Sequence, residues 1–93
     1  MIIVHVPTEA GNKMVNDPNG MQTLENYLKK IKAEATYFAE DKGERTFYIV
    51  ADIASADKLP SIAEPMFQGL NAKVEVHPAM NLDDLKRAIQ NLV

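Results

Sequence analysis

Two histidines and one glutamate are the residues best suited to chemistry in this chain. Glu75 and His77 are two positions apart in the segment NAKVEVHPAM, which has the pattern of a β-strand, so both side chains project to one side. His5 lies in the first apolar segment, which we expect to form the neighbouring strand. Because a histidine titrates near neutral pH and a carboxylate can orient it, these three residues predict a general acid and base.

Two other interpretations of these three residues stay open. The side chains could simply hydrogen-bond to one another across a hydrated dimer interface, and we favour this interpretation over catalysis because structural networks also perturb titratable groups. Two histidines and a carboxylate could also bind a metal ion. The chain has no Cys and no H-x-x-H or H-E-x-x-H motif, so we predict no metal site.

Four further residues are candidates for contact with a ligand. Tyr48 in RTFYIV could donate a proton to a ligand oxygen, although a tyrosine on a strand more often packs against its neighbours. Arg45 could bind an anionic ligand, or it could be a solvated strand end. Glu9 and Asn12 in PTEAGN could line the mouth of a cavity, or the segment could merely start a helical turn at Thr8.

The composition is that of one globular domain. The chain has 93 residues, of which 46% are hydrophobic and 25% charged, so we predict a single domain over residues 1–93. The net charge of −3 and the dispersed Lys and Arg residues disfavour a nucleic-acid partner. The absence of Cys, of a signal-peptide pattern and of an apolar run near the roughly 20 residues that span a bilayer predicts a cytoplasmic protein with no membrane contact.

Hydrophobic periodicity predicts the elements that position these residues. Strands are expected over Ile2 to Val6, Ala35 to Glu40, Arg45 to Ile53 and in NAKVEVHPAM, and helices over Gly20 to Glu34, Ser55 to Gly69 and after Asn81. Gly43 marks a hairpin turn between the second and third strands. Pro65 is expected to kink its helix and to turn Met66 and Phe67 onto the sheet.

The last helix should be capped by Asn81 and amphipathic. Its buried side is predicted to carry Leu82, Leu85, Ile89 and Leu92. The whole order is β-α-β-β-α-β plus a C-terminal helix, an α+β chain with the ferredoxin-like arrangement. We expect an antiparallel sheet in the order 4-1-3-2, with both main helices on one face.

Strand alternation predicts what lies on the other, open face of this sheet. Ile3 and His5 should lie there, together with Glu75 and His77. Tyr48 and Val50 are placed on the same face, because Phe47 and Ile49 suit a helix-covered core better. A face with this apolar content is unlike a fully solvated sheet, so we expect a second copy of the chain to cover it.

Four segments resemble the signature segments of a family of short stand-alone bacterial proteins of unknown function. They are PTEAGN, RTFYIV, IAEPMF and NAKVEVHPAM. The family is part of the dimeric α/β-barrel superfamily, in which two ferredoxin-like domains press their open sheet faces together and enclose a cavity. The chain is more distantly similar to the muconolactone isomerases. The resemblance implies a fold and a homodimer, and implies no reaction.

The resemblance also has departures that bear on function. With no Trp, the chain cannot carry the Asn and Trp pair associated with the cofactor-free monooxygenases of the superfamily. No segment matches a catalytic motif of the isomerases. No catalytic residue is therefore carried over from either group.

Two functions are therefore expected for this chain. The first is a homodimeric module that binds a small ligand or only assembles, without a cofactor. The second is a cofactor-independent, isomerase-like enzyme acting on a small metabolite, in which His77 and His5 are acid and base, Glu75 orients them and Tyr48 is a donor. Convergence of the two histidines and Glu75 around an apolar pocket would favour the enzyme.

Overall fold

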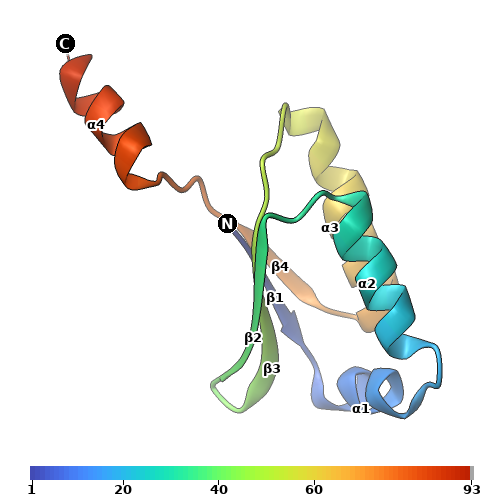
Figure 1. The fold of residues 1–93 in the computed structure, drawn as a ribbon. Helices are drawn as coiled ribbons and strands as arrows, with labels where there is room; N and C mark the ends of the chain where they lie inside the picture. The colour runs from blue at the N-terminus through green and yellow to red at the C-terminus, as the bar shows by residue number, and fades with distance from the viewer. Residues whose placement is uncertain (93) are drawn as a thin grey trace.

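A computed structural model describes residues 1–92 of the chain (Figure 1). The elements, in chain order, are β1 (Ile2–Val6), α1 (Thr8–Asn16), α2 (Gly20–Lys30), β2 (Ala35–Asp41), β3 (Glu44–Val50), the short 3₁₀ turn η1 (Ala56–Lys58), α3 (Leu59–Leu70), β4 (Lys73–Val76) and α4 (Leu82–Gln90). Val93, the last residue of the predicted domain, lies outside the described residues. The α+β class is confirmed, and α1 is a full helix of 9 residues where the sequence predicts a short helical turn after Pro7.

The strands form one antiparallel sheet in the order β2-β3-β1-β4. This order is the predicted 4-1-3-2 read from the opposite edge. Helices α2 and α3 lie on one face of the sheet, as predicted, and α1 lies beyond the end of β1 (Figure 1). The opposite face is not covered by either main helix.

The helix-covered face of the sheet carries the core. Strands β1 and β3 contribute alternate residues that are almost completely buried, namely Ile2, Val4, Val6, Phe47 and Ile49. Helix α2 packs Leu24 and Tyr27 onto them, and α3 packs Ile62 and Met66. Burying one such apolar side chain contributes about 1.5–3 kcal/mol, so these few residues dominate the stability of a small domain. The predicted division of β3 is confirmed, because Phe47 and Ile49 face the helices.

The β2–β3 hairpin closes through a two-residue turn. Lys42 and Gly43 both have positive φ, 53° and 81°, as a turn of type I′ requires. The Gly43 N–H donates to the Glu40 carboxylate at 2.9 Å. The turn fixes the register in which Asp41 pairs with Glu44.

Helix α3 is unbroken from Leu59 to Leu70, with Pro65 inside it. Met66 is buried as predicted, but the prediction that Phe67 packs on the sheet is wrong, because its side chain is 42% exposed. Met66 follows Ile62 by four residues and shares its face of the helix. Phe67 is turned by about 100° from Met66, so both cannot face the sheet while the helix continues.

Helix α4 begins with the predicted cap. The Asn81 side chain accepts the N–H of Asp84 at 2.8 Å, and the Asp84 carboxylate accepts the N–H of Asn81 at 3.2 Å, which forms a capping box. The prediction that this helix has a buried side is wrong, since its apolar stripe is exposed: Leu82, Leu85, Ile89 and Leu92. Periodicity identifies an apolar side of a helix but does not say which surface covers it.

Candidate functional site

The candidate site lies on the open face of the sheet. The register pairs Ile3 of β1 with Tyr48 of β3 and with Glu75 of β4, so these three side chains project to the same face. His5, two residues further along β1, lies on that face as well. The side chains of Ile3, His5 and Tyr48 are half-buried, although no helix covers them.

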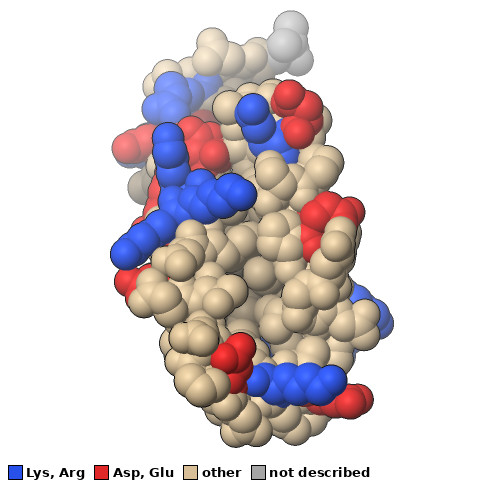
Figure 2. Space-filling view, turned by 90° about the vertical axis from the view of Figure 1, so that its right-hand side faces the viewer, with Lys and Arg blue, Asp and Glu red and all other residues tan. Residues whose placement is uncertain are grey.

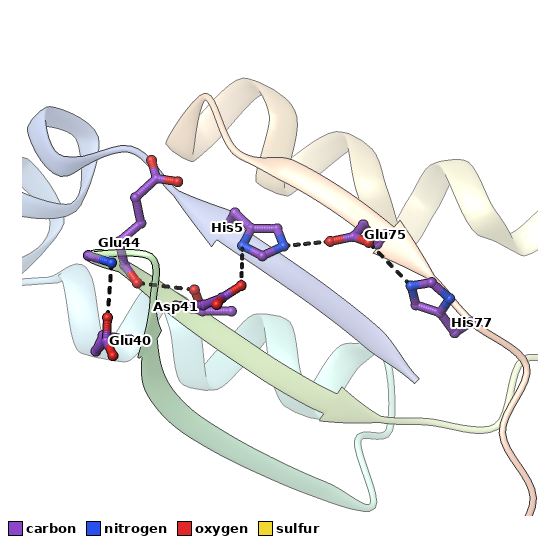
Figure 3. A network of polar contacts seen from close by, with 8 residues as sticks. His5, Glu40, Asp41, Glu44, Glu75 and His77 are labelled. Atoms are coloured by element: carbon purple, nitrogen blue, oxygen red, sulfur yellow. Dashed lines mark hydrogen bonds and ion pairs between the residues drawn. The ribbon is translucent and has the colours of Figure 1, made fainter.

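The two histidines and Glu75 meet on this face (Figure 3). His5 Nε2 lies 2.5 Å from Glu75 Oε2, and His77 Nε2 lies 3.3 Å from Glu75 Oε1. One carboxylate therefore joins two imidazoles from neighbouring parts of the sheet. The predicted convergence within hydrogen-bond reach is found, whereas the catalytic roles of the three residues stay a prediction.

Backbone pairing places His77 within reach of Glu75. The His77 N–H donates to the Met1 carbonyl at 2.8 Å, and the Met1 ammonium donates to the His77 carbonyl at 2.6 Å. These bonds continue the β1–β4 ladder for one residue beyond the end of β4. His77 therefore keeps the strand alternation and projects to the same face as Glu75.

A second carboxylate flanks His5 on the opposite side of its ring. Asp41 Oδ2, at the end of β2, lies 3.9 Å from His5 Nδ1 (Figure 3). The sequence analysis missed Asp41. Its signal was the hairpin register: a two-residue turn at Lys42 and Gly43 places Asp41 at the end of β2, on the same face as His5.

The electrostatics of Glu75 follow from this geometry. The hydrogen bond with His5, and then that with His77, hold the pKa of Glu75 below its ordinary value of 4.5, while desolvation acts weakly in the opposite direction. Glu75 is therefore an ionised hydrogen-bond acceptor at neutral pH. It can orient the imidazoles, but it has no proton to donate as a general acid.

The accessibility of the three side chains differs. His5 is the least exposed, at 17%, whereas Glu75 and His77 are 49% and 56% exposed. His77 uses only Nε2 in this cluster, so its other ring nitrogen remains available to a ligand. The arrangement can bind a polar ligand group through His77, backed by the negative charge of Glu75.

Tyr48 lies on the same face but outside the hydrogen-bonded cluster. Its partners in the sheet are Ile3 on β1 and Tyr37 on β2. Within residues 1–92 its hydroxyl makes no hydrogen bond with another side chain or with the backbone. Tyr48 therefore contributes an aromatic surface beside the cluster, and its hydroxyl is free to meet a ligand or a partner.

The three predicted ligand-binding residues do not join this cluster. Arg45 pairs with Val6 on the helix-covered side of the sheet, and its Nη2 donates to Asn12 Oδ1 of α1 at 3.1 Å. A Cβ added at Gly11 would lie 2.6 Å from Arg45 Nη1, so the glycine lets the guanidinium lie against the helix. Arg45 and Asn12 thus tie α1 to β3, and the binding of an anionic ligand by Arg45 stays a prediction.

Glu9, the third of these residues, lines a cleft on the helical side of the molecule. The cleft lies among α1, α2 and α3 and has a volume of about 550 Å³. Leu24, Tyr27 and Met66 contribute to its lining, and Figure 2 shows this face as a hollow surrounded mainly by uncharged side chains. The sequence analysis did not predict this cleft, which lies on the side of the sheet opposite to the His5–Glu75–His77 cluster.

One polar group is buried beside this cleft. The Tyr27 hydroxyl donates to the Ile62 carbonyl at 2.7 Å and so links α2 to α3. Burial raises the pKa of Tyr27 to about 12. The hydroxyl therefore stays protonated, as a structural hydrogen-bond donor.

The described part of the chain has neither a grouped set of metal-ligating side chains nor a membrane-spanning helix. Across residues 1–92, no three His, Cys, Asp or Glu side chains are grouped so that they could hold a metal ion. Over the same residues, no helix has both the length and the apolar character needed to cross a bilayer.

The fold and the cluster define an α+β chain of ferredoxin-like arrangement with an imidazole–carboxylate group on its open sheet face. No protein-family model, no curated protein and no solved structure matches the chain. The resemblance to the dimeric α/β barrels and the muconolactone isomerases stays a prediction, and function must be argued from the site itself.

Proposed function

We propose that this chain is a cytoplasmic, homodimeric module that binds a small ligand between two open sheet faces, as in a dimeric α/β barrel. One observation carries the proposal: the uncovered face combines half-buried apolar side chains with the hydrogen-bonded His5–Glu75–His77 cluster. Half-buried apolar side chains are unusual on a fully solvated sheet face, and a polar hydrogen-bonded cluster is unusual in a purely structural core.

The apolar part of the face supports a second copy as the covering surface. Ile3, Tyr48 and Val50 are half-buried within one chain and would be covered by the same residues of a partner across a two-fold axis. Such an interface should bury on the order of 1,000 Å² or more, with apolar residues at its centre.

The polar part of the face supports a small ligand with at least one oxygen or nitrogen atom to hydrogen-bond. His77 has a free ring nitrogen, and Glu75 holds a negative charge beside it. The apolar body of such a ligand would lie against Ile3 and Tyr48, while its polar group would meet His77. Pairing the two faces would remove this cluster from bulk water and strengthen those hydrogen bonds.

Sedimentation of the purified chain tests the dimer. We expect the wild-type chain to sediment as a dimer at micromolar concentration and Val50→Lys as a monomer, because a lysine there would be desolvated without a partner charge. Val15→Lys is the matched control, since Val15 lies on α1 and is 58% exposed. A monomeric wild type, or a Val50→Lys variant that dimerises like the control, would refute the interface.

A second function, an isomerase-like enzyme, is favoured by the contact between Glu75 and both histidines. A carboxylate that orients an imidazole is what proton transfer at a substrate carbon requires, and His77 would then be the acid or base. The ligand would first be identified in native mass spectra of protein taken directly from cells. An enzyme would exchange a carbon-bound proton of that ligand with deuterated water, and His77→Gln would not.

The two functions give different results in that exchange experiment. If the wild-type chain binds the ligand without proton exchange and His77→Gln abolishes binding, the chain is a binding module. If His77→Gln leaves both binding and exchange unchanged, the cluster has neither function. Circular dichroism checks that the variant keeps its fold.

A further inference from the structure

Helix α4 is a strongly amphipathic element that packs on no other element within residues 1–92. Leu82 is 65% exposed, Leu85 41% and Ile89 57%, and these three lie on one side of the helix. Leu92, just beyond the end of the helix, is 77% exposed. None of its residues is buried, and Figure 1 shows the helix standing away from the sheet. The longest dimension of the molecule is 51 Å, against 27 Å and 18 Å for the other two.

A helix of this length does not hold together without packing. Isolated helices shorter than about 12–15 residues are marginal in water, and α4 has 9 residues. The capping box at Asn81 helps only its first turn. The exposed leucines and Ile89 therefore indicate a surface on which α4 packs in the assembled protein.

The path of the chain determines which surface α4 can reach. The bonds between Met1 and His77 hold the chain in the sheet up to His77, and Pro78 then ends the ladder. In Figure 1, α4 lies on the side of the sheet opposite to α2 and α3. That is the side of the open face, where the proposed second copy packs.

The edges of the sheet identify the part of the second copy that α4 meets. Strands β4 and β2 form opposite edges of the sheet. A two-fold axis that runs along the strands, between two stacked sheets, brings the β4 edge of one copy over the β2 edge of the other. On β2, Tyr37 pairs with Tyr48 and projects to the open face, where its side chain is 68% exposed, whereas Phe38 pairs with Phe47 on the helix-covered face.

We propose that α4 is an exchanged arm that packs its apolar stripe against Tyr37, at the β2 edge of the open face of a second copy of this chain. This inference rests on the proposed homodimer and adds two contacts to it, one from the α4 helix of each copy. The helix is short enough to lie along the strand, because the 9-residue α4 is about 14 Å long and the 7-residue β2 is about 23 Å long. Each copy would cover the exposed Tyr37 side chain of the other.

Hydrogen exchange on the full-length chain tests the arm. We expect the amides of α4 to be protected in the wild-type dimer and to exchange at rates near those of an unfolded peptide in monomeric Val50→Lys. Equal protection in that monomer would mean that α4 folds back onto its own chain. No protection in a wild-type chain that sediments as a dimer would mean that the arm is free, and either result overturns the inference.

Two charge substitutions on α4, one on the apolar stripe and one beside it, test whether the stripe itself makes the contact. We expect Ile89→Glu to weaken the dimer at least about tenfold, because it places a charge in the apolar contact, and Gln90→Glu, one position away, to leave it unchanged. If Ile89→Glu also leaves the dimer unchanged while Val50→Lys dissociates it, the arm is wrong and the sheet interface stands. If the wild type is a monomer, both proposals fail.

Disulfide trapping locates the docking surface. The natural sequence has no Cys, so single cysteines can be introduced without background. Mixing Tyr37→Cys with Ile89→Cys under oxidising conditions should give a cross-linked pair of chains. The control mixture replaces Tyr37→Cys with Val15→Cys on α1, and equal yields from the two mixtures would place α4 somewhere other than β2.

Discussion

The two faces of the sheet are built from alternate residues of the same strands, yet they have opposite characters. On the helix-covered face, Ile2 and its cross-strand partner Ile49 are completely buried. On the open face, the next pair along, Ile3 and Tyr48, is half-buried and lies beside the imidazole–carboxylate cluster. The first face is explained entirely within one chain. The second carries apolar area and titratable groups that neither main helix covers, and it is there that we propose a second copy and a ligand.

The largest expected effect comes from truncating neighbouring isoleucines on the two faces. Ile2→Ala should lower the free energy of unfolding by about 2–5 kcal/mol, because it leaves a cavity under the helices. Ile3→Ala, the same substitution one residue along β1, should cost less than half as much at low protein concentration, since the open face is then partly solvated. Urea titration measures both.

Measuring the unfolding midpoints of Ile2→Ala and Ile3→Ala at several protein concentrations gives a second comparison of the two faces. The midpoint of Ile2→Ala should shift with concentration as the wild type does, whereas Ile3→Ala should lose part of that dependence because it weakens the dimer contact. Equal costs for the two variants at every concentration would contradict the difference between the faces.

The second prediction compares two tyrosine hydroxyls. Tyr27→Phe should cost about 0.5–1.5 kcal/mol, because it removes a buried hydrogen bond and leaves the Ile62 carbonyl unpaired. Tyr48→Phe should change the unfolding free energy by less than about 0.5 kcal/mol, since no described residue bonds its hydroxyl. Thermal unfolding of the two variants provides the measurement, and a larger loss for Tyr48→Phe would contradict this assignment.

The smallest expected effect is on the pH dependence of stability. The folded-state pKa of Glu75 lies below its ordinary value of 4.5, so its contribution is fully present above pH 4.5 and is lost as the pH falls through the lowered pKa. Glu75→Gln should therefore flatten the unfolding free energy of the protein against pH in that acidic range. The effect should be modest because the side chain is exposed.

Asp83→Asn is the control for this titration, since Asp83 lies on α4, which stands away from the sheet that carries the cluster (Figure 1). It should leave the acid dependence caused by Glu75 in place. An acid profile of Glu75→Gln that follows the wild type would show that the hydrogen bonds with the histidines do not stabilise the folded state.

Most of the fold could be predicted from the sequence because strand alternation is local. The turn at Gly43 makes the second and third strands neighbours, and the β-α-β-β-α-β succession predicts the sheet order. Alternation along the strands then predicts which side chains face the helices. The same alternation placed His5, Glu75 and His77 on one face, and their meeting follows from the register.

The errors arose where a contact depends on more than the hydrophobic pattern. The position of Phe67 depends on whether α3 continues through Pro65. The contact of Arg45 with Asn12 likewise required knowing that α1 packs against β3. Helix α4 is a further example, because its periodicity identifies an apolar stripe but not the surface that covers the stripe. The local sequence pattern does not identify a ligand either.

The most direct test of the open face as an interface is a native mass spectrum of the full-length protein, taken directly from cells at micromolar concentration. The chain has a mass of 10.3 kDa. The account predicts a species of two chains carrying additional small-molecule mass, which Val50→Lys converts to single chains without that mass. A wild-type spectrum that contains only single chains of 10.3 kDa would contradict the account.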